Sequence, residues 1–472
     1  DADVSPGTDS MPFLLDALYL LALVVLSPWL VWRAVATGRY RRDLGAKLLG
    51  RVRVPNPDRK PVAWFHGVSV GEIHLLATVV AAFRKRHPDW LVVVSSTTDT
   101  GLDEARKRFT DSPVIAYPFD FSWAVAAALD SVKPSLVVLA EGEMWPNFLH
   151  AAARRNIPVA VVNARMSPRS FARLRRLAGP ARRLMFRYVD AFAVQSADYA
   201  DRLRQLGVDA NKLTVTGSVK YDGATGDRSR ARELRALLGL PLETRGGEEE
   251  RGRRGEEEKR SQTARASSPL LPLSSSPPLP TPTVWVAGST HAPEEAIVLG
   301  VFVKLRLRFP QLRLILVPRH PDRFAEVAQL VERSGLPFAR RSQITAPLPE
   351  MPAVVLLDTV GELGAAWGLA DVGYTGGSLD GQRGGQSMIE PAGYGVPTLF
   401  GPHVWNFRDA ANRLLDAGGA VMVNDAAELE RELAKLLEDA GLRERMGEAA
   451  RKLVREQQGA TGRTLDVLDR VM

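Results

Sequence analysis

Three carboxylates that lie shortly after apolar runs are the residues of this sequence best placed to do chemistry. Glu72 ends the stretch HGVSVGE, which follows VAWF and precedes the apolar-periodic run IHLLATVVAAF. Glu141 and Glu143 come just after the apolar run LVVL. Carboxylates at adjacent strand ends raise each other's pKa, which suits a general base. Taken alone, Glu72 is more simply explained as a helix cap, because an acidic side chain stabilises the positive end of the helix dipole.

Two cations accompany these carboxylates. We expect an arginine such as Arg165 to neutralise one of the pair Glu141 and Glu143. Lys220, in GSVKYD, follows the last apolar run of the first half. It is either an ordinary surface lysine or a cation that meets a negatively charged donor or leaving group. Gly67 and Gly71, which flank VSV, predict a sharp turn and a close approach of the backbone to a ligand.

Polar residues also follow the apolar runs of the second half. Arg319 and His320 come directly after LRLILVP and suit a phosphate or a base edge. Gly361 and Glu362, in DTVGEL, are predicted to begin a helix. These positions suit a ligand that carries a phosphate or a base.

The stretch GGSLDGQRGGQSMIEPAGYGVP is the most informative part of the second half. A glycine-rich loop here is predicted to lead into a helix near Ser387, whose free N–H groups suit a phosphate. Glu390, about one turn into that helix, can accept two hydrogen bonds from a ribose diol. A glycine-rich loop alone is weak evidence, but loop, helix start, Glu and a following short strand together predict a nucleotide-sugar site.

Cysteine and histidine usage limits the possible chemistry. The chain has no cysteine, which excludes disulfides, thiolate nucleophiles and Cys-based metal sites. The seven histidines are scattered without paired ligand spacing. We therefore expect no metal and no other cofactor, and we expect helix N-termini and Arg319 to meet the phosphate charge.

These residues require a particular set of elements to position them. The β-rich runs are apolar throughout, as parallel strands covered on both faces are, and they alternate with helical stretches. This pattern predicts βαβ units in two α/β halves of similar size, with ligands bound at the carboxyl ends of the strands in the cleft between two lobes. The predicted strands are 62–66, 90–97, 135–141, 159–164, 190–196 and 212–218 in the first half, and 283–289, 312–318, 353–358, 371–377 and 396–401 in the second. A C-terminal helical region is predicted from about Ala426.

A compositionally different segment separates the halves. Residues 244–283 are rich first in Gly, Glu and Arg and then in Pro and Ser, with almost nothing to bury. Such composition predicts a disordered insertion or linker.

Residues Phe13–Trp32 form an apolar stretch with one charge, Asp16. Its 20 residues have about the length that spans a bilayer core, and Arg33, Arg39, Arg41, Arg42 and Lys47 follow as on a cytoplasmic flank. A cleaved signal peptide would carry its positive charge before the apolar run. The stretch predicts a membrane anchor, spanning or deeply inserted, whereas Asp16 and Pro28 argue against a clean span. A buried helix is the alternative.

The net charge of +8 is concentrated in the first half. Lys and Arg clearly outnumber Asp and Glu over residues 33–222, whereas the two kinds are nearly balanced over 284–472. An anionic partner is therefore expected on the first half. Together with the apolar segment, this favours membrane lipids, and no nucleic-acid partner is expected. The alternative is that the arginines of residues 169–188 form a solvated helix face.

Several motifs in this order resemble the 3-deoxy-D-manno-octulosonic acid (Kdo) transferase family. They are WFHGVSVGE, EGEMWPN, VNARMSPRS, TVTGSVKYD, AGSTHAPEE, LVPRHPDRF, DTVGEL and GGSL…GGQSMIEPAGYGVPTLFGPH. The resemblance covers about residues 12–222 and 284–460. Two positions depart from the common pattern: Gln386 and Ser387 stand where the family commonly has His and Asn, and AEGE replaces METE. The first departure changes side chains at the predicted helix start, and the second keeps both carboxylates.

The resemblance implies a GT-B glycosyltransferase with two Rossmann-like domains and an N-terminal membrane-anchor helix. It implies CMP-Kdo as donor and a lipid A precursor (lipid IVA) as acceptor, without metal and with inversion at the anomeric carbon. Glu72 would be the general base, and Glu141 and Lys220 would support the transition state. The residues that would hold CMP are Pro318, Arg319, Val360, Gly361, Glu362, Ser387, Met388, Ile389 and Glu390.

The expected domain organisation follows from these features. The predicted order is a disordered tail (1–11), a membrane-anchor helix (12–33), an acceptor-binding Rossmann-like domain (34–222), a linker with the insertion (223–283), a CMP-sugar-binding Rossmann-like domain (284–455) and a C-terminal helix (456–472). Both domains are expected on the cytoplasmic face of the inner membrane.

Two other functions fit parts of the sequence. A nucleotide-sugar 2-epimerase of the same fold needs no lipid acceptor, so the apolar segment and the basic first half count against it. A membrane-tethered, non-enzymatic nucleotide-binding protein would have little use for two carboxylates at the cleft.

Overall fold

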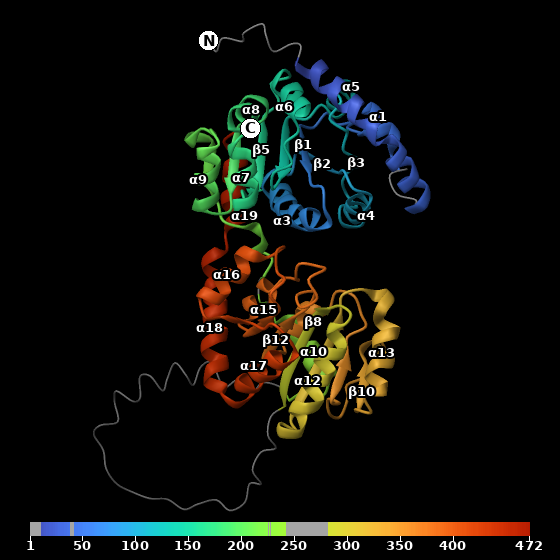
Figure 1. Ribbon diagram of the computed structural model, residues 1–472, viewed down its shortest axis with the longest axis vertical. Coiled ribbons are helices and arrows are strands. Elements are labelled where there is room, and N and C mark those ends of the chain that lie inside the picture. The colour runs from blue at the N-terminus through green and yellow to red at the C-terminus, as the bar shows by residue number, and fades with distance from the viewer. Residues whose placement is uncertain (1–10, 38–41, 225, 227, 242–281) are drawn as a thin grey trace, which may run out of the picture. The chain divides into compact units, whose positions relative to one another are not determined.

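The computed structural model describes residues 11–37, 42–224, 226, 228–241 and 282–472. The chain forms two compact units (Figure 1). The first unit runs to Gly223 and also contains residues Gln457–Met472, and the second contains Ala224–Glu456. The predicted tail at 1–11 and the predicted insertion at 244–283 lie almost wholly outside the described residues.

The first unit is built on a parallel sheet with the strand order β3-β2-β1-β4-β5-β6-β7. Its strands are β1 (Val62–His66), β2 (Leu91–Ser96), β3 (Val114–Ala116), β4 (Leu136–Ala140), β5 (Val159–Ala164), β6 (Ala191–Val194) and β7 (Leu213–Val215). Its helices are α1 (Met11–Thr37), α2 (Leu44–Leu49), α3 (Val70–Arg86), α4 (Asp99–Arg108), α5 (Ser122–Val132), α6 (Pro146–Ala153), α7 (Pro168–Arg175), α8 (Ala178–Leu184), α9 (Ala197–Gln205) and α19 (Ala460–Asp469).

The apolar composition of these strands is explained by burial on both faces. Every residue of β1, β4 and β5 is buried. Alternate residues of β1 enter two different apolar clusters: Trp64 packs in one with Phe148, and Phe65 packs in the other with Phe83. Because β1 pairs with β4 in parallel, with His66 opposite Leu139, the segments that follow these two strands emerge side by side.

The second unit repeats the design with the order β10-β11-β9-β8-β12-β13-β14. Its strands are β8 (Thr283–Thr290), β9 (Leu312–Pro318), β10 (Phe338–Arg340), β11 (Val354–Leu356), β12 (Val372–Thr375), β13 (Thr398–Phe400) and β14 (Ala420–Met422). Its helices are α10 (Ser229–Leu237), α12 (Glu294–Arg308), α13 (Phe324–Arg333), α14 (Leu363–Trp367), α15 (Ile389–Tyr394), α16 (Arg408–Asp416), α17 (Ala426–Glu438) and α18 (Ala440–Gln457). Both sheets are parallel throughout, which confirms the predicted α/β architecture.

The structure adds elements that the sequence pattern does not predict. Three short strands, β3, β10 and β14, extend the edges of the sheets. Helix α10 lies within the range expected as linker and packs on α14.

Helix α19 packs on α3, where Arg86 binds Asp466 and Asp469 at 2.8 Å each. The last helix of the chain is therefore part of the first unit.

Helix α1 covers the predicted anchor and continues to Thr37. Its segment Met11–Trp29 is long and apolar enough to cross a membrane, judged by length and composition. Most of its described side chains are exposed, so α1 is not the buried core helix that was the alternative.

Candidate active site

Glu72 lies in the first turn of α3 and takes part in its N-terminal cap. Ser69 is the N-cap residue, and its Oγ accepts from the backbone N–H of Glu72 at 3.3 Å and donates to Glu72 Oε1 at 3.1 Å. Glu72 Oε2 accepts from the N–H of Val68 at 2.7 Å. This reciprocal arrangement is a capping box. The capping interpretation of Glu72 is therefore confirmed, and any catalytic role is additional to it.

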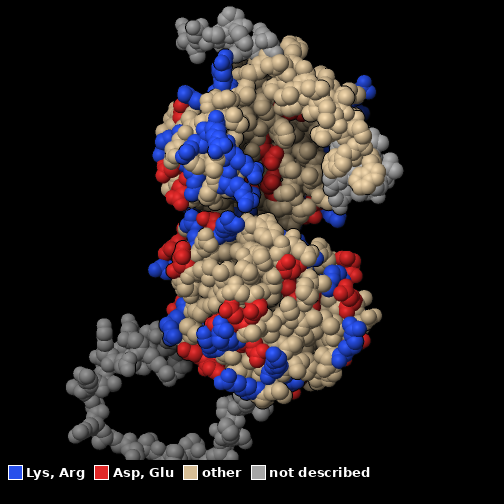
Figure 2. Space-filling view, in the orientation of Figure 1, with Lys and Arg blue, Asp and Glu red and all other residues tan. Residues whose placement is uncertain are grey.

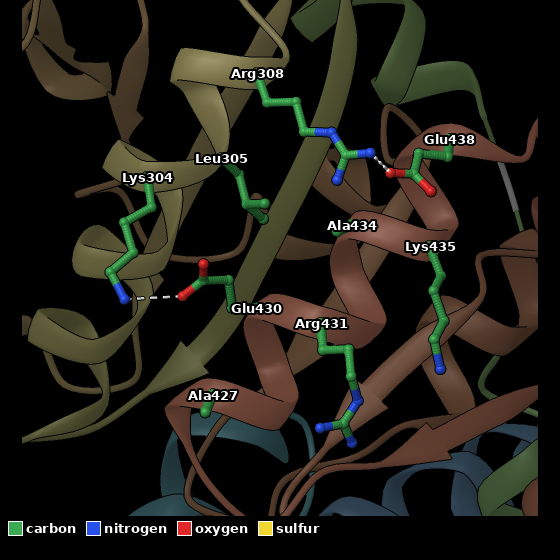
Figure 3. Close-up of a pocket in the computed structure, with 9 residues that line it drawn as sticks. All are labelled: Lys304, Leu305, Arg308, Ala427, Glu430, Arg431, Ala434, Lys435 and Glu438. Atoms are coloured by element: carbon green, nitrogen blue, oxygen red, sulfur yellow. Dashed lines mark hydrogen bonds and ion pairs between the residues drawn. The ribbon is translucent and has the colours of Figure 1, made fainter.

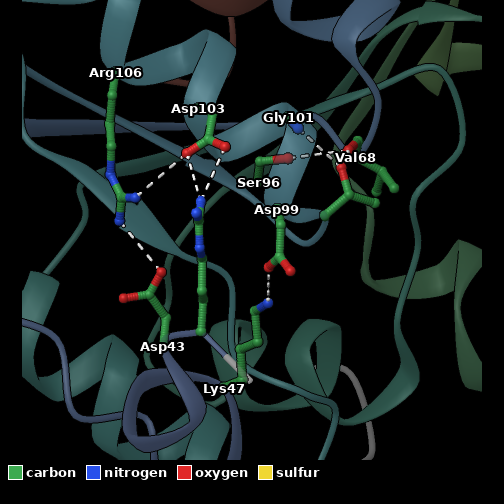
Figure 4. Close-up of polar contacts among 10 residues, drawn as sticks. Asp43, Lys47, Val68, Ser96, Asp99, Gly101, Asp103 and Arg106 are labelled. Carbon is green, nitrogen blue, oxygen red and sulfur yellow. Dashed lines mark hydrogen bonds and ion pairs between the residues drawn. The ribbon is translucent and has the colours of Figure 1, made fainter. Parts of the chain in front are cut away.

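The loop before Glu72 is held by the end of β2 and by the N-cap residue of α4. The carbonyl oxygen of Val68 accepts from Ser96 Oγ at 3.0 Å and from Thr98 Oγ1 at 2.6 Å (Figure 4). A side chain at Gly101 would come within 2.7 Å of the same carbonyl oxygen, so the position requires glycine. Buried Lys47 pairs with Asp99 at 3.0 Å and fixes the start of α4. Glu72 thus sits on a rigid support.

The two glycines of HGVSVGE do not make the predicted sharp turn. Neither Gly67 nor Gly71 has a positive φ, and α3 already begins at Val70. A Cβ at Gly67 would lie 3.1 Å from the Cβ of Glu72, so this glycine makes room for the catalytic candidate. Gly71 meets only Ser69 Oγ, at 3.9 Å.

Glu141 follows β4 and is held by two cations. Its Oε2 lies 2.8 Å from Arg165 Nε, and its Oε1 lies 3.2 Å from Lys220 Nζ. Asn163 Nδ2 approaches Oε1 at 3.4 Å. The backbone of Glu141 has φ of 57°, a left-handed conformation that costs energy for a residue with a side chain. The expectation that an arginine neutralises one of the two carboxylates after β4 is confirmed for Glu141, and Lys220 is its second partner.

Glu72, Glu141 and Glu143 line one cavity of about 350 Å³ in the first unit. Burial raises the pKa of Glu72, and the negative charge of Glu141 adds to the increase, while the hydrogen bond from Val68 opposes it. Burial likewise raises the pKa of Glu143, with a further increase from the charge of Glu72. The predicted proximity of carboxylates from β1 and β4 is therefore present, with Glu143 as a third member.

The rest of the cavity is apolar with a basic edge. Met144, Met166, Leu174 and Phe186 contribute to its wall, and Arg165 and Ser170 provide polar groups. Helices α7 and α8 carry further arginines that are exposed. Figure 2 shows Lys and Arg gathered on this part of the first unit, beside a hollow with acidic atoms on its floor. This combination suits an acceptor with both apolar and anionic groups.

In the second unit, basic residues gather near the glycine-rich loop. Arg319 follows β9 directly, since Pro318 is the last residue of that strand, and the N–H of Arg319 binds the carbonyl oxygen of Thr290 at 3.0 Å. The His291 and His320 rings lie 5.1 Å apart. Burial and, as the next largest cause, the positive charge of Arg383 together lower the pKa of His291 to about 4, so His291 is neutral at pH 7.

The glycine-rich loop is organised by a carboxylate that sequence reasoning missed. Glu294 is fully buried and accepts from the N–H groups of Gly377 at 2.6 Å and Ser378 at 3.0 Å. The hydroxyl of Tyr374 donates to Glu294 at 2.8 Å. Glu294 follows β8 in AGSTHAPEE just as Glu72 follows β1 in HGVSVGE, and this parallel was the available signal. His291 in the same motif and Arg383, which pairs with Asp380, were also missed.

The end of the glycine-rich loop differs in detail from the prediction. Helix α15 begins at Ile389, two residues after Ser387, so Glu390 lies in its first turn rather than one turn in. The side chains of Met388 and Ile389 are buried, which leaves only their backbone groups for a ligand. The side chain of Glu390 is exposed. Desolvation by the surrounding protein nevertheless raises the pKa of its carboxyl, and the positive charge of Arg319 opposes this increase. Arg319 and Glu390 therefore belong to one site.

The third predicted contact follows β11. Gly361 has φ of 90°, and Glu362 is the N-cap residue of α14, as predicted for DTVGEL. The carboxylate of Glu362 is held by Arg341 at 3.0 Å and by Thr359. Val360 is 80% exposed and so is open to a ligand.

A larger groove of about 540 Å³ in the second unit lies elsewhere, between α12 and α17. Its cations are paired with its carboxylates: Lys304 binds Glu430 at 2.9 Å, and Arg308 binds Glu438 (Figure 3). Because these charges satisfy each other at the surface, the groove has no evident preference for an anionic nucleotide.

Two Rossmann-like units define the class of protein, since together they form the GT-B fold. Crystallised UDP-GlcNAc 2-epimerase from Neisseria meningitidis shares this fold with a TM-score of 0.51 and 13% identity, over 87% of this chain and 100% of that chain. Residues 44–223 match the family model described as 3-deoxy-D-manno-octulosonic-acid transferase (kdotransferase).

Full-length relatives identify the family. The chain is 30% identical to 3-deoxy-D-manno-octulosonic acid transferase of Haemophilus influenzae, over 97% of both chains. It is 33% identical to the enzyme of the same name from Bordetella pertussis, over 96% of this chain and 98% of the relative. The chain belongs to the 3-deoxy-D-manno-octulosonic acid (Kdo) transferase family, as its motifs predicted.

Proposed function

We propose that this protein transfers Kdo from CMP-Kdo to a lipid A precursor, lipid IVA, with Glu72 as the general base. The observation that carries the proposal is the difference between two neighbouring carboxylates. Glu141 is bound by Arg165 and Lys220. Glu72 has no ion pair among the described residues and a raised pKa. A carboxylate of raised basicity that is free of a cation is the better proton acceptor.

In the proposed reaction, the Glu72 carboxylate takes the proton of an acceptor hydroxyl. The hydroxyl oxygen attacks the anomeric carbon of Kdo, the bond from that carbon to the phosphate oxygen of CMP breaks, and the configuration inverts. The pair Glu141 and Lys220 provides fixed opposite charges as charge separates in the transition state. Fixed charges cost no reorganisation during the reaction.

We assign the acceptor to the first unit and the donor to the second. The cavity beside Glu72 combines apolar walls with a basic edge, which matches an acylated, phosphorylated sugar. Arg319 and backbone groups of the loop before α15 are suited to the phosphate of CMP, and Glu390 to its ribose. The reaction needs no metal in this proposal, because protein cations and N–H groups meet the phosphate charge. We also place the enzyme at the cytoplasmic face of the inner membrane, and the apolar helix α1 supports its attachment to a membrane.

The test is incubation of the purified protein with CMP-Kdo and a tetra-acylated lipid A precursor. We expect a lipid product heavier by one or more Kdo residues, the release of CMP, and an anomeric configuration in the product opposite to that of the donor by NMR. If no lipid product forms with or without detergent, the proposal fails. Conversion of UDP-GlcNAc to its 2-epimer would instead favour an epimerase of the same fold.

A further inference from the structure

Helix α1 is attached to the first unit by a polar contact that a free membrane span would not have. Asp16 is 5% exposed, and its Oδ1 accepts from the N–H of Ser122 at 2.9 Å and from Asn147 Nδ2 at 3.1 Å. Asp16 Oδ2 accepts from the hydroxyl of Ser122. The one charge in the apolar segment is therefore satisfied by the body of the protein.

This contact supplies a helix cap that α5 lacks. The N-cap residue of α5, Phe121, makes no side-chain capping bond, so the free N–H groups at that end need another acceptor. Asp16 of α1 is that acceptor at Ser122. Asp120 caps helix α6 in a similar way, because its carboxylate accepts from the N–H groups of Asn147 and Phe148.

A second contact of α1 leads to the same place. Tyr19, about one turn after Asp16, donates its hydroxyl to Asp120 at 3.1 Å, and its ring meets Phe121 edge to face. The N-terminal half of α1 is thus held by the starts of α5 and α6. Beyond this half, nearly every described side chain of α1 is exposed.

The docked geometry leaves too little helix for a span. From Leu20 to Trp32, the apolar part beyond the contacts rises only about 20 Å, whereas a bilayer core is about 30 Å thick. Crossing with the whole helix would require Asp16 to leave its partners and enter hydrocarbon, which is costly for a carboxylate and leaves the start of α5 uncapped.

The exposed side of α1 is apolar and continues onto neighbouring helices. Leu14, Leu21 and Val24 are more than half exposed on α1. Trp123 of α5 is also exposed, and its indole N–H binds the carbonyl oxygen of Leu48 in α2, next to exposed Leu49. Contiguous apolar surface of this kind marks an interaction site.

The occupant that fits this surface is one leaflet of an anionic phospholipid bilayer. Trp29, Trp32 and Trp123 are exposed, and tryptophan prefers the boundary between headgroups and hydrocarbon. In Figure 2 the arginines of the α7 and α8 region and the apolar α1 appear on one face of the first unit, on either side of the hollow. Basic side chains at the depth of the headgroups complement lipid phosphates.

We propose that α1 lies along one leaflet without crossing the membrane, docked to the first unit through Asp16. The proposal does not depend on the reaction proposed above. It makes the protein monotopic, and the cavity that contains Glu72 is then held at a fixed height relative to the lipid surface.

The topology can be tested by thiol labelling, since the chain has no cysteine of its own. Ser5→Cys lies before α1, and Thr110→Cys lies at an exposed position after α4. A membrane-impermeant maleimide is applied to right-side-out and to inverted inner-membrane vesicles. We expect both variants to be labelled in the same vesicle orientation. Labelling in opposite orientations would show that α1 crosses and would overturn the proposal.

Docking is tested separately by thermal unfolding of the purified protein. Asp16→Leu makes α1 more apolar. If α1 were a free span, this substitution would therefore leave the Tm unchanged or raise it. We expect a lower Tm for Asp16→Leu and a smaller decrease for Asp16→Asn. Ser27→Leu is the matched control, because Ser27 Oγ bonds only within α1, to Val24. Equal Tm values for all three variants and the wild type would contradict docking.

The occupant is tested with vesicles of phosphatidylethanolamine and phosphatidylglycerol. Leu21→Glu with Val24→Glu should weaken co-sedimentation roughly tenfold or more, because a carboxylate in hydrocarbon is costly. Light scattering in detergent should show an unchanged molecular mass. If the variant changes the molecular mass while vesicle binding persists, the apolar surface binds a second copy of the chain, and the proposal is wrong.

Discussion

Glu72 and Ser69 hydrogen-bond each other twice at the start of α3. Ser69 Oγ accepts from the N–H of Glu72 at 3.3 Å and donates to Glu72 Oε1 at 3.1 Å. The same carboxylate is therefore both part of the helix cap and the proposed base. The cap restricts the side chain to one orientation before any acceptor arrives, which is the pre-organisation that proton transfer requires.

Ser69→Ala should destabilise the fold and also alter catalysis. Loss of an N-cap hydroxyl lowers the free energy of unfolding by about 1 kcal/mol. The variant also loses a hydrogen bond that lowers the pKa of Glu72, so the acidic limb of the activity profile should move to higher pH. Thermal unfolding and kcat/KM against pH measure the two effects.

Ser196→Ala is the matched control for this variant. Ser196 caps α9 through the N–H of Tyr199 at 3.4 Å and is not part of the carboxylate cavity. It should lose similar stability without moving the pH profile. If the pH profile shifts equally in both variants, the shift comes from the loss of any helix cap and not from a change at the Glu72 carboxylate.

The pH dependence of activity should reflect the environment of Glu72. A base acts when ionised, so kcat/KM rises with pH through its pKa and then levels off. Because burial raises this pKa and Glu141 raises it further, the midpoint should lie above the ordinary value of 4.5. Glu141→Gln removes a negative neighbour and frees two cations, and both changes move the midpoint to lower pH. A midpoint that moves upward would contradict the assignment.

Glu294→Gln should loosen the glycine-rich loop. A buried carboxylate that accepts three or more hydrogen bonds is replaced by an amide whose NH₂ group faces N–H donors. We expect a decrease of about 1–3 kcal/mol in the free energy of unfolding and weaker CMP binding by calorimetry. Glu326→Gln, at an exposed carboxylate that pairs with Arg323, should change neither. If Glu294→Gln binds CMP as tightly as the wild type does, the glycine-rich loop is not part of the donor site.

Chelation should not affect the enzyme. Among the described residues no group of three or more His, Asp or Glu side chains is arranged to hold a metal ion. In the proposal Arg319 and backbone N–H groups meet the phosphate charge. Turnover after dialysis against EDTA should equal that of the untreated protein. A loss that Mg²⁺ restores would show that a metal carries part of this charge.

Much of the fold was predictable because parallel strands are buried on both faces. The runs VAWFH, VAVVNA and LRLILVP coincide with β1, β5 and β9 residue for residue. Strands β3, β10 and β14 were missed, since a strand of three residues is too short to show a periodicity. Strand β7 is equally short, but it was found because it lies within the longer β-rich run KLTVTGS. Helix α10 was missed because it is short and four of its nine residues are charged.

The candidate site was predictable where a polar residue follows a recognisable strand. This rule identified Glu72, Glu141 and Arg319. It does not reveal pairing, so the ion pair between Lys220 and Glu141 became visible only when β4 and the segment after β7 were placed in one sheet. The role of Asp16 was hidden for the same reason, since its partners lie more than one hundred residues away.

The central claim is that Glu72 is the general base, and single-turnover kinetics of Glu72→Gln tests it most directly. With CMP-Kdo and a tetra-acylated lipid A precursor, we predict a transfer rate roughly 10²–10⁴-fold below wild type, with unchanged CMP binding and a Tm close to that of the wild type. Glu104→Gln, at a half-buried carboxylate of α4 that pairs with His74 and Arg108 and does not line the Glu72 cavity, should transfer at the wild-type rate. A Glu72→Gln protein that is folded, binds CMP and transfers Kdo at the wild-type rate would contradict the account and leave Glu72 as a helix cap alone.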